Sequence, residues 1–591
     1  MPGLVEIHYQ KRKNTSLFKT MQEHPKLQLT NLQNYIPIYD SFFSLSTTNF
    51  NSFNLNHEAF LLSVQNKPSD TANLLTCRIG NTGLEGDEYC ASQRVFFKMA
   101  PLLDPFKYVI GKYNHEDPHL FDLPVKPKSP HVHPKIADPG NSSYVDSFFS
   151  YLSSRLLHQH GFIHGLDFYG AFLGVQRGFS LNIIDDLDYL VKSDFFNRQK
   201  SKLFEVEDYS HLLPEEPRVS LRPIHISDVS LKTTFLDFDA LEEELVPVSS
   251  LEPVSSTSST LIDLTENQTE HHEAQDAASI KSLSTCSSRT SRTEESEQDE
   301  KASAEENDDD LDVDVDDEYD DEDDNEDDVE SCEQFDEDRL TLTINEFPVQ
   351  VICMEPCEDT LDGLVGRQEL STEEWLSALL QVIFSLIAYQ KAFQFTHNDL
   401  HTNNVMYTET KQKHLYYCYQ KKYYKVPTFG RIFKIIDFGR AIYHFQGKRI
   451  CSDSFQKGGD ADTQYNTEPY FNEKKPRIEP NPSFDLCRLA CSIFDYLVDD
   501  FDDLDNLIQQ NPVTRLIVEW CTDDNGLNVL YKASGIERYP DFKLYKMIAR
   551  CVHNHTPQAQ LQRPEFQKYI VTKKQVKAGD PMFDLDALPV Y

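Results

Sequence analysis

Apolar residues along this chain follow two different spacings, and each spacing predicts a different kind of element. Continuous or alternating apolar runs predict strands at residues 74–80 and 88–101, on either side of a turn that contains glycines. A third strand is expected at residues 166–175 and a fourth at residues 342–355. The fourth ends in the apolar run VQVIC, so we expect it to be buried.

Two other segments show the three- and four-residue spacing of helices. In the first, Asn141 can cap the helix, because its side-chain oxygen accepts a free first-turn N–H group. The apolar residues that follow it at helical spacing are Val145, Phe148, Phe149, Leu152 and Leu156. The second helix, at residues 376–395, contains several polar side chains, so we expect it to be buried in the protein and not to span a membrane. The N-terminus has no apolar signal core, and export is not expected.

Charge is distributed unevenly along the chain. Of 591 residues, 97 are acidic and 56 are Lys or Arg, which gives a net charge of −41. Residues 305–338 contain 23 of the acids and no basic residue. With the Ser/Thr-rich stretch before it, this block makes residues 245–338 too polar to form a core, so we expect disorder there. No sustained basic stripe is present, which argues against DNA or RNA as the main ligand.

Two short segments carry the candidate chemistry. Residues 397–404 read HNDLHTNN, and residues 434–439 read KIIDFG. Phosphoryl transfer requires a carboxylate that orients the attacking hydroxyl, and Asp399 supplies one. It also requires oxygen ligands for Mg²⁺, which Asn404 and Asp437 supply as an amide and a carboxylate. The order of the two segments matches the catalytic loop and the DFG sequence of protein kinases.

On these residues the chain resembles the eukaryotic protein-kinase-like superfamily, over residues 75–180 and 340–570. The DLH sequence at residues 399–401 is similar to that of haspin-type kinases. The longer sequences THNDLHTNNVMY and YYKVPTFGRIFKIIDFGRAIY resemble kinase-like proteins of large nucleocytoplasmic DNA viruses. The resemblance implies an α+β, bilobal fold, with a small β-rich N-lobe that carries the αC helix and a larger helical C-lobe. It also implies a serine/threonine protein kinase that uses ATP and Mg²⁺, with Asp399 and His401 as catalytic residues.

The resemblance divides the chain into five parts. Residues 1–74 are an N-terminal extension, and residues 75–244 are the first part of the N-lobe. Residues 245–338 are the disordered acidic insert, residues 339–357 are the last N-lobe strand and the hinge, and residues 358–591 are the C-lobe. The insert leaves and re-enters the same lobe, so the strands that flank it are expected to be neighbours in one sheet.

The remaining nucleotide-binding residues are expected where a kinase fold would place them. Lys98 ends the run VFFK and would contact the α- and β-phosphates of ATP. Gly80, Gly83 and Gly86 precede it by 18, 15 and 12 residues, which suits a phosphate-binding loop and equally a plain hairpin turn. Asp146 stands in place of the αC glutamate that holds this lysine. Its side chain is one methylene shorter, so we expect a strained or water-bridged pair.

The hinge and the αF helix are expected in the second half of the kinase-like region. Met354, Glu355 and Cys357 follow the fourth strand, and the backbone of this hinge would bind adenine. Asp485 resembles the aspartate at the start of αF, which accepts N–H groups from the catalytic loop.

Other features depart from the kinase pattern or leave alternatives open. Asn398 replaces an arginine that binds an activation-loop phosphate in many kinases, so switching by loop phosphorylation is less expected. His401 replaces a lysine, and a neutral imidazole can donate a hydrogen bond but carries no permanent charge. Arg563 resembles the late arginine that pairs with a glutamate ending the activation segment. Both Glu468 and Glu479 are candidates for that glutamate.

The segment at residues 405–436 is longer than the usual short hairpin of this region. Its run HLYYCYQKKYYKVP is aromatic and basic. A β-hairpin that packs its tyrosines is favoured over a surface that binds an acidic peptide or a nucleic-acid strand.

Two other functions compete with that of a protein kinase. A small-molecule kinase of the choline or aminoglycoside type also carries HxDLHxxN. A pseudokinase would act as an interaction protein through its acidic insert. The expected partners are protein substrates, and basic proteins that bind the insert. The cysteine content fits reduced thiols inside a cell, so we expect the cytoplasm or nucleus, or a host cell or virion if the protein is viral.

Overall fold

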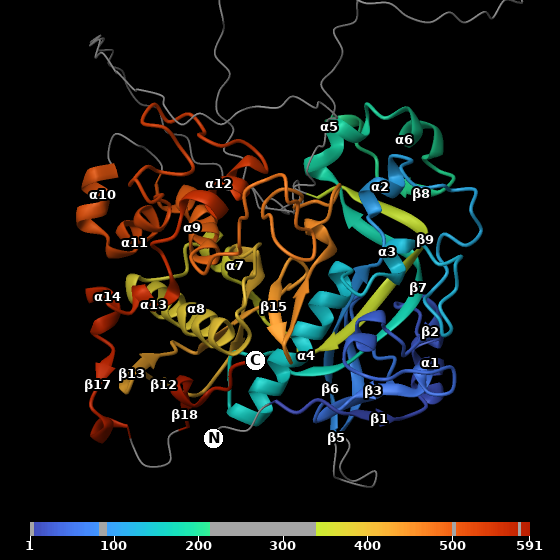
Figure 1. The fold of residues 1–591 in the computed structure, drawn as a ribbon, viewed down its shortest axis with the longest axis horizontal. Helices are drawn as coiled ribbons and strands as arrows, with labels where there is room; N and C mark the ends of the chain where they lie inside the picture. The colour runs from blue at the N-terminus through green and yellow to red at the C-terminus, as the bar shows by residue number, and fades with distance from the viewer. Residues whose placement is uncertain (1–4, 82–90, 213–338, 499–503, 577–580) are drawn as a thin grey trace, which may run out of the picture. The chain divides into compact units, whose positions relative to one another are not determined.

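The computed structural model describes residues 5–81, 91–212, 339–498, 504–576 and 581–591 (Figure 1). The described residues up to Glu207 and from 339 onwards belong to one compact unit, to which the following description applies. Gly83, Gly86 and the predicted insert at residues 245–338 lie outside the described residues.

The N-terminal half is built on a curled antiparallel sheet of seven strands (Figure 1). Along the sheet the order is β4–β5–β6–β9–β7–β2, and β8 pairs with β9. The strands are β2 (Leu29–Gln33), β4 (Ala59–Val64), β5 (Leu74–Asn81), β6 (Ala91–Pro101), β7 (Phe168–Asn182), β8 (Phe204–Val206) and β9 (Thr341–Met354). With the helices described below, this sheet confirms the predicted α+β class.

The strands on either side of the predicted insert are neighbours, as expected. β7 and β9 pair antiparallel from Phe168↔Met354 to Asn182↔Thr341. The last eight residues of β9 are all buried, which explains why this part of the strand is almost entirely apolar and does not alternate. The segment predicted as an N-terminal extension, residues 1–74, supplies β2 and β4 and is therefore part of the same sheet.

Shorter elements complete this half of the protein. They are β1 (Tyr9–Lys11), α1 (Thr15–Glu23), β3 (Phe53–Leu55), α2 (Pro105–Val109), α3 (Pro134–Ala137), α5 (Leu187–Leu190) and α6 (Asp194–Gln199).

The helix α4 (Ser142–His160) packs against β7 and β9 (Figure 1). The predicted cap is confirmed, because the Asn141 side chain accepts the Ser143 N–H at 3.1 Å. The helix ends at Gly161, whose φ of 67° is the left-handed conformation that glycine adopts without strain. Every residue from Ser143 to Leu156 is buried, so this helix lies inside the molecule.

The C-terminal half contains both helices and short strands. Its helices are α7 (Leu361–Gly366), α8 (Thr372–Phe393), α9 (Phe484–Leu497), α10 (Leu504–Gln510), α11 (Pro512–Trp520), α12 (Lys543–Cys551), α13 (Pro557–Gln560) and α14 (Pro564–Gln567). Among the described residues, α8 is the one helix long and apolar enough to cross a membrane, but 89% of its most apolar window is buried inside the protein. It starts at a capping box in which Ser371 and Glu374 satisfy each other's backbone N–H groups.

Short strands connect these helices. They are β10 (Asp359–Thr360), β11 (Val405–Glu409), β12 (His414–Tyr419), β13 (Lys422–Pro427), β14 (Arg431–Ile435), β15 (Ile442–Phe445), β16 (Lys448–Cys451), β17 (Ile570–Val571) and β18 (Met582–Asp584). The predicted hairpin is confirmed, because β12 and β13 pair antiparallel. Tyr417 and Tyr424 are each only 1% exposed, so the hairpin buries aromatic rings against the protein.

Candidate functional site

Lys98 lies between two carboxylates that are far from it in the sequence. Its Nζ is 2.7 Å from Oδ2 of Asp146 and 2.9 Å from Oδ1 of Asp437. Burial opposes the charge of this lysine, but the two carboxylates outweigh burial and raise its pKa above the ordinary value. The predicted contact of Lys98 with Asp146 of the following helix is therefore confirmed, and Lys98 contacts Asp437 as well.

Asp146 makes a second contact that the sequence did not predict. Its Oδ1 accepts the backbone N–H of Phe438 at 2.9 Å, while Oδ2 meets Lys98. One buried carboxylate on α4 therefore fixes both the lysine of β6 and the backbone directly after Asp437. Of the two alternatives expected for this pair, a water bridge is excluded, because Asp146 reaches Lys98 directly in spite of its shorter side chain.

The loop after α8 is hydrogen-bonded to Asp485, near the start of α9. The N–H groups of His397 and Asn398 each donate to Asp485, over 2.9 Å to Oδ2 and 2.9 Å to Oδ1 respectively. The Asp485 side chain is fully buried, and burial raises its pKa. These two contacts are the ones predicted for Asp485, and they fix the backbone directly before Asp399.

Asn398 has a structural part in the same loop. Its φ of 65° is in the left-handed region, which asparagine tolerates better than most residues. The buried side chain donates to the Arg440 carbonyl at 2.9 Å and accepts the Tyr465 hydroxyl at 2.7 Å. The Asn398 amide thus binds the segment that follows Asp437.

Asp399 is held in place by residues from two other segments. The Tyr545 hydroxyl, on α12, donates to Oδ1 of Asp399 at 2.8 Å, and the Arg440 guanidinium lies 3.4 Å from the same oxygen. Burial raises the pKa of Asp399, but the charges of Arg440 and Arg488, His401 and the hydrogen bond from Tyr545 together outweigh burial, and the pKa is lowered to about 2. Asp399 is therefore ionised at neutral pH and acts as a hydrogen-bond acceptor.

The hydrogen bonds of Asn404 fix the state of His401. The Asn404 Nδ2 is 2.9 Å from the Asp399 carbonyl, which can only accept, so the amide nitrogen must face this carbonyl. The same nitrogen lies 3.0 Å from Nε2 of His401. Nε2 must accept there, which leaves the proton of the neutral ring on Nδ1. Burial lowers the pKa of His401 to about 4, consistent with a neutral ring at pH 7.

Two oxygen groups suit a divalent cation next to these residues. The orientation of Asn404 leaves its Oδ1 as the free end of the amide, and its backbone carbonyl accepts the Ile436 N–H at 3.0 Å. That bond brings Asn404 next to the residue before Asp437. The Asp437 side chain is 46% exposed, so its second oxygen can bind a ligand while the first binds Lys98. This donor set fits Mg²⁺.

Comparisons with known proteins add nothing to this geometry. No family model matches the chain, and no curated protein is a significant match to it. The function is therefore inferred from the side chains of the site.

The residues predicted as the hinge lie beside Lys98 in the sheet. Ile352 of β9 is opposite Lys98, and Met354 ends the same strand. Glu355 forms an ion pair with Lys434, and its N–H donates to the Asp167 carbonyl at 2.9 Å. The N–H of Glu355 is thus occupied within the protein. Burial raises the pKa of the Cys357 thiol to about 12, so this cysteine is not a reactive thiolate. The adenine-binding role of this hinge stays a prediction.

Gly80 has a packing reason to be glycine. It lies in β5 opposite Phe60 of β4, and a Cβ atom there would be 3.0 Å from the side chains of Phe60 and Leu62. This contact is tighter than most Cβ atoms make. Gly83 and Gly86 belong to residues outside the described part of the chain, so the phosphate-loop hypothesis stays a prediction.

The prediction that Arg563 pairs with Glu468 or Glu479 was wrong. Arg563 forms an ion pair with Glu519 of α11, and neither candidate glutamate contacts it. Glu468 instead lies 2.6 Å from Arg477, and Glu479 lies 2.5 Å from the same arginine. Arg563 directly precedes α14, and at this point its side chain reaches α11, which carries Glu519.

Proposed function

We propose that this protein is a serine/threonine protein kinase that transfers a phosphoryl group from ATP with the help of Mg²⁺. In this proposal the sheet with α4 is the smaller lobe of a bilobal, kinase-like fold, and the C-terminal half is the larger lobe. The observation that carries the proposal is the convergence of Lys98, Asp146 and Asp437 beside Asp399 and Asn404. These groups come from four separate parts of the chain, and each has the charge that phosphoryl transfer requires at its position.

Each side chain has a distinct role in the proposed reaction. Lys98, held by Asp146, binds phosphate oxygens. Asn404 and Asp437 hold Mg²⁺, which neutralises charge on the phosphates when it is bound. Asp399 accepts a hydrogen bond from the attacking hydroxyl. Because its pKa is about 2, Asp399 orients the hydroxyl and is a weak base, which is sufficient when little proton transfer precedes the transition state.

The test is an assay of the purified chain with Mg-ATP and three acceptors, namely casein, histone and choline. Phosphorylation of a protein acceptor supports the proposal, whereas phosphorylation of choline alone identifies a small-molecule kinase. Asp399→Asn and Asp437→Ala should each lower turnover by several orders of magnitude without unfolding the protein. Asp188→Asn, at an exposed acid of α5, is the matched control and should keep full activity. Near-normal turnover in either site variant rules out the proposed mechanism.

A further inference from the structure

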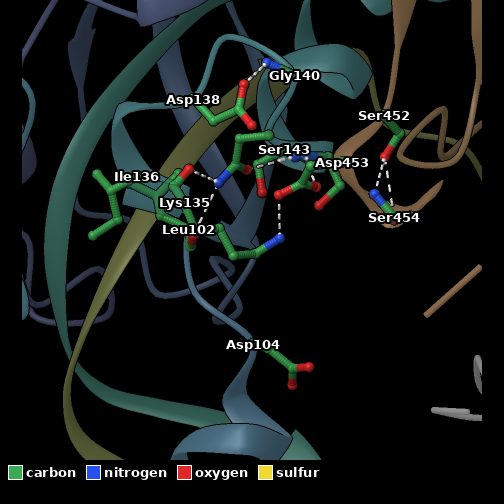
Figure 2. A network of polar contacts seen from close by, with 12 residues as sticks. Leu102, Asp104, Lys135, Ile136, Asp138, Gly140, Ser143, Ser452, Asp453 and Ser454 are labelled. Atoms are coloured by element: carbon green, nitrogen blue, oxygen red, sulfur yellow. Dashed lines mark hydrogen bonds and ion pairs between the residues drawn. The ribbon is translucent and has the colours of Figure 1, made fainter. Parts of the chain in front are cut away.

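The first turn of α4 is bound by a carboxylate from the segment that follows Asp437. Asp453 comes directly after β16 and Ser452, and its side chain is fully buried (Figure 2). Its Oδ1 accepts the Ser142 N–H at 3.0 Å, and its Oδ2 forms an ion pair with Lys135. The Asp453 N–H also donates to the Gly140 carbonyl at 2.7 Å. Both the side chain and the backbone of Asp453 therefore bind the start of this helix.

The other side of the same turn is tied to the strand that carries Lys98. The Asn141 amide donates to the Leu102 carbonyl at 2.9 Å, and the Ser143 hydroxyl donates to the Pro101 carbonyl at 2.7 Å. Pro101 is the last residue of β6. The start of α4 is thus fixed between the end of β6 and residue 453, as the labelled side chains in Figure 2 show.

This turn is directly connected to the candidate site. Ser142 lies one helical turn before Asp146, and Asp146 binds both Lys98 and the Phe438 N–H. A movement of the first turn would therefore carry Asp146 away from the lysine. Asp453 does not touch the candidate ligands itself, so its effect on them passes through the helix.

We infer that Asp453 is a positioning residue, which holds α4, and through it Asp146 and Lys98, in the arrangement that binds nucleotide. The inference rests on the proposed kinase function. It adds that the Asp453 carboxylate supplies the negative charge at the start of α4. The site is therefore assembled without phosphorylation of the segment after Asp437. Asn398 agrees with this, because its neutral amide binds the same segment through Tyr465 and the Arg440 carbonyl.

The chemistry of the contact supports a role for charge. The free N–H groups and the positive end of the dipole at a helix N-terminus favour a carboxylate. Burial alone raises the pKa of Asp453, and the ammonium of Lys135 opposes this shift. Hydrogen bonds between ionised partners are stronger than those between neutral groups. A neutral amide at this position keeps the shape of the side chain and loses the interaction with Lys135.

The test compares Asp453→Asn and Asp453→Ala with Asp138→Asn in the full-length protein. Asp138 belongs to the same network and accepts the Gly140 N–H at 2.8 Å, but within the described residues its side chain makes no hydrogen bond with α4, so it is a matched control. We expect the dissociation constant for a non-hydrolysable Mg-ATP analogue to rise roughly tenfold in Asp453→Asn, and further in Asp453→Ala. The KM for ATP rises with it, and the KM for the acceptor peptide does not change. Amide exchange in the first turn of α4 becomes faster, whereas exchange in α9 does not.

The outcomes separate the inference from the function on which it rests. If the wild-type chain binds Mg-ATP and transfers phosphate, but both Asp453 variants match Asp138→Asn in nucleotide affinity and in α4 exchange, the positioning role is wrong and the kinase proposal stands. If the wild-type chain binds no Mg-ATP at all, the proposed function and this inference fall together. If phosphatase treatment of the wild-type chain abolishes nucleotide binding, the assembly depends on a phosphate and the inference is overturned.

Discussion

At the scale of single residues, His401 stands where the resemblance to kinases leads one to expect a lysine, and its ring has a different task. Nε2 of His401 accepts a hydrogen bond from the Asn404 amide, which turns the amide oxygen of Asn404 outward. A lysine ammonium has three donors and no acceptor, so it cannot replace this bond. His401 thus orients a candidate metal ligand.

We therefore predict that His401→Lys, which introduces the residue that many kinases carry in the catalytic loop, lowers turnover by at least tenfold and weakens Mg²⁺ binding. His401→Gln should retain more activity, because its amide oxygen can still accept from Asn404. Turnover measured as a function of Mg²⁺ concentration tests both variants. Equal or higher activity in His401→Lys would show that the ring acts on the phosphoryl group instead.

Tyr545 is the second residue whose effect can be measured directly. Its hydroxyl donates to Oδ1 of Asp399, and the Arg440 and Arg488 guanidinium groups lie over its ring at 5.7 and 5.1 Å from the centroid. Tyr545→Phe should keep the ring packing, lower kcat by about tenfold, and move the acid limb of the pH–rate profile upward, because Asp399 loses a donor. Tyr539→Phe, just before the same helix, is the control. An unchanged profile in Tyr545→Phe would mean that Arg440 alone sets the state of Asp399.

The sequence predicted those parts of the site that depend on residue type, and missed those that depend on distant neighbours. Lys98 and Asp485 stand in recognisable local patterns and make the contacts expected of them, whereas Asp146 also accepts the Phe438 N–H, which no local pattern predicts. No local sequence pattern marks Tyr545 or Asp453, because each contacts the site region through a segment that is far away in the sequence. For the same reason the partner of Arg563 was wrong.

At the scale of elements, the chain segments on either side of residues 213–338 are hydrogen-bonded to each other. The Glu207 N–H donates to the Thr341 carbonyl at 3.0 Å, and the Thr341 N–H donates to the Glu207 side chain at 2.7 Å. β8 pairs with β9 just before this point. The chain therefore leaves and re-enters the sheet at one place, and the length of the connection matters little to the sheet.

From this we predict that replacing residues 245–338 with a short Gly/Ser linker changes the free energy of unfolding by no more than about 1 kcal/mol, because loop closure varies only slowly with length. Urea unfolding followed by circular dichroism measures this, and Mg-ATP binding reports on the site. A loss of cooperative unfolding in the shortened chain would mean that the replaced residues support the fold.

The strands and long helices were mostly predictable, and the exceptions have a common cause. β5, β6, β7, β9, α4 and α8 carry continuous or periodic apolar runs. β2 and β4 lie in a stretch rich in Asn and Ser, where short strands have no clear period, so their membership of the sheet was not expected. Each of them instead pairs with a longer strand at an edge of the sheet: β2 pairs with β7, and β4 pairs with β5.

At the scale of the whole molecule, three buried neutral histidines make stability depend on pH. His57, His164 and His401 are at most 6% exposed, and burial lowers the pKa of each from 6.5 to about 4. In the unfolded chain these rings take up protons at higher pH than in the folded chain. Their contribution is therefore complete above about pH 6.5 and is lost as the pH falls towards 4.

We predict that His164→Gln reduces the loss of unfolding free energy between pH 7 and pH 4.5 by up to about 3 kcal/mol. Denaturant unfolding of both chains at the two pH values measures the difference. The comparison between chains removes the contribution of the acids, which titrate in both. Identical pH dependence in the two chains would show that His164 is not neutral in the folded protein.

The position of β9 also bears on how the protein is synthesised. β9 is the central strand between β6 and β7, but the ribosome adds it long after both. Until it emerges, β6 and β7 each present an unpaired edge to the cell, and such edges readily pair with other chains. Lys98 and Asp146 are already present at that stage, whereas Asp399, Asn404 and Asp437 are not. The nascent chain must therefore be protected from association throughout the synthesis of the acidic stretch, whose high charge favours solubility during that interval.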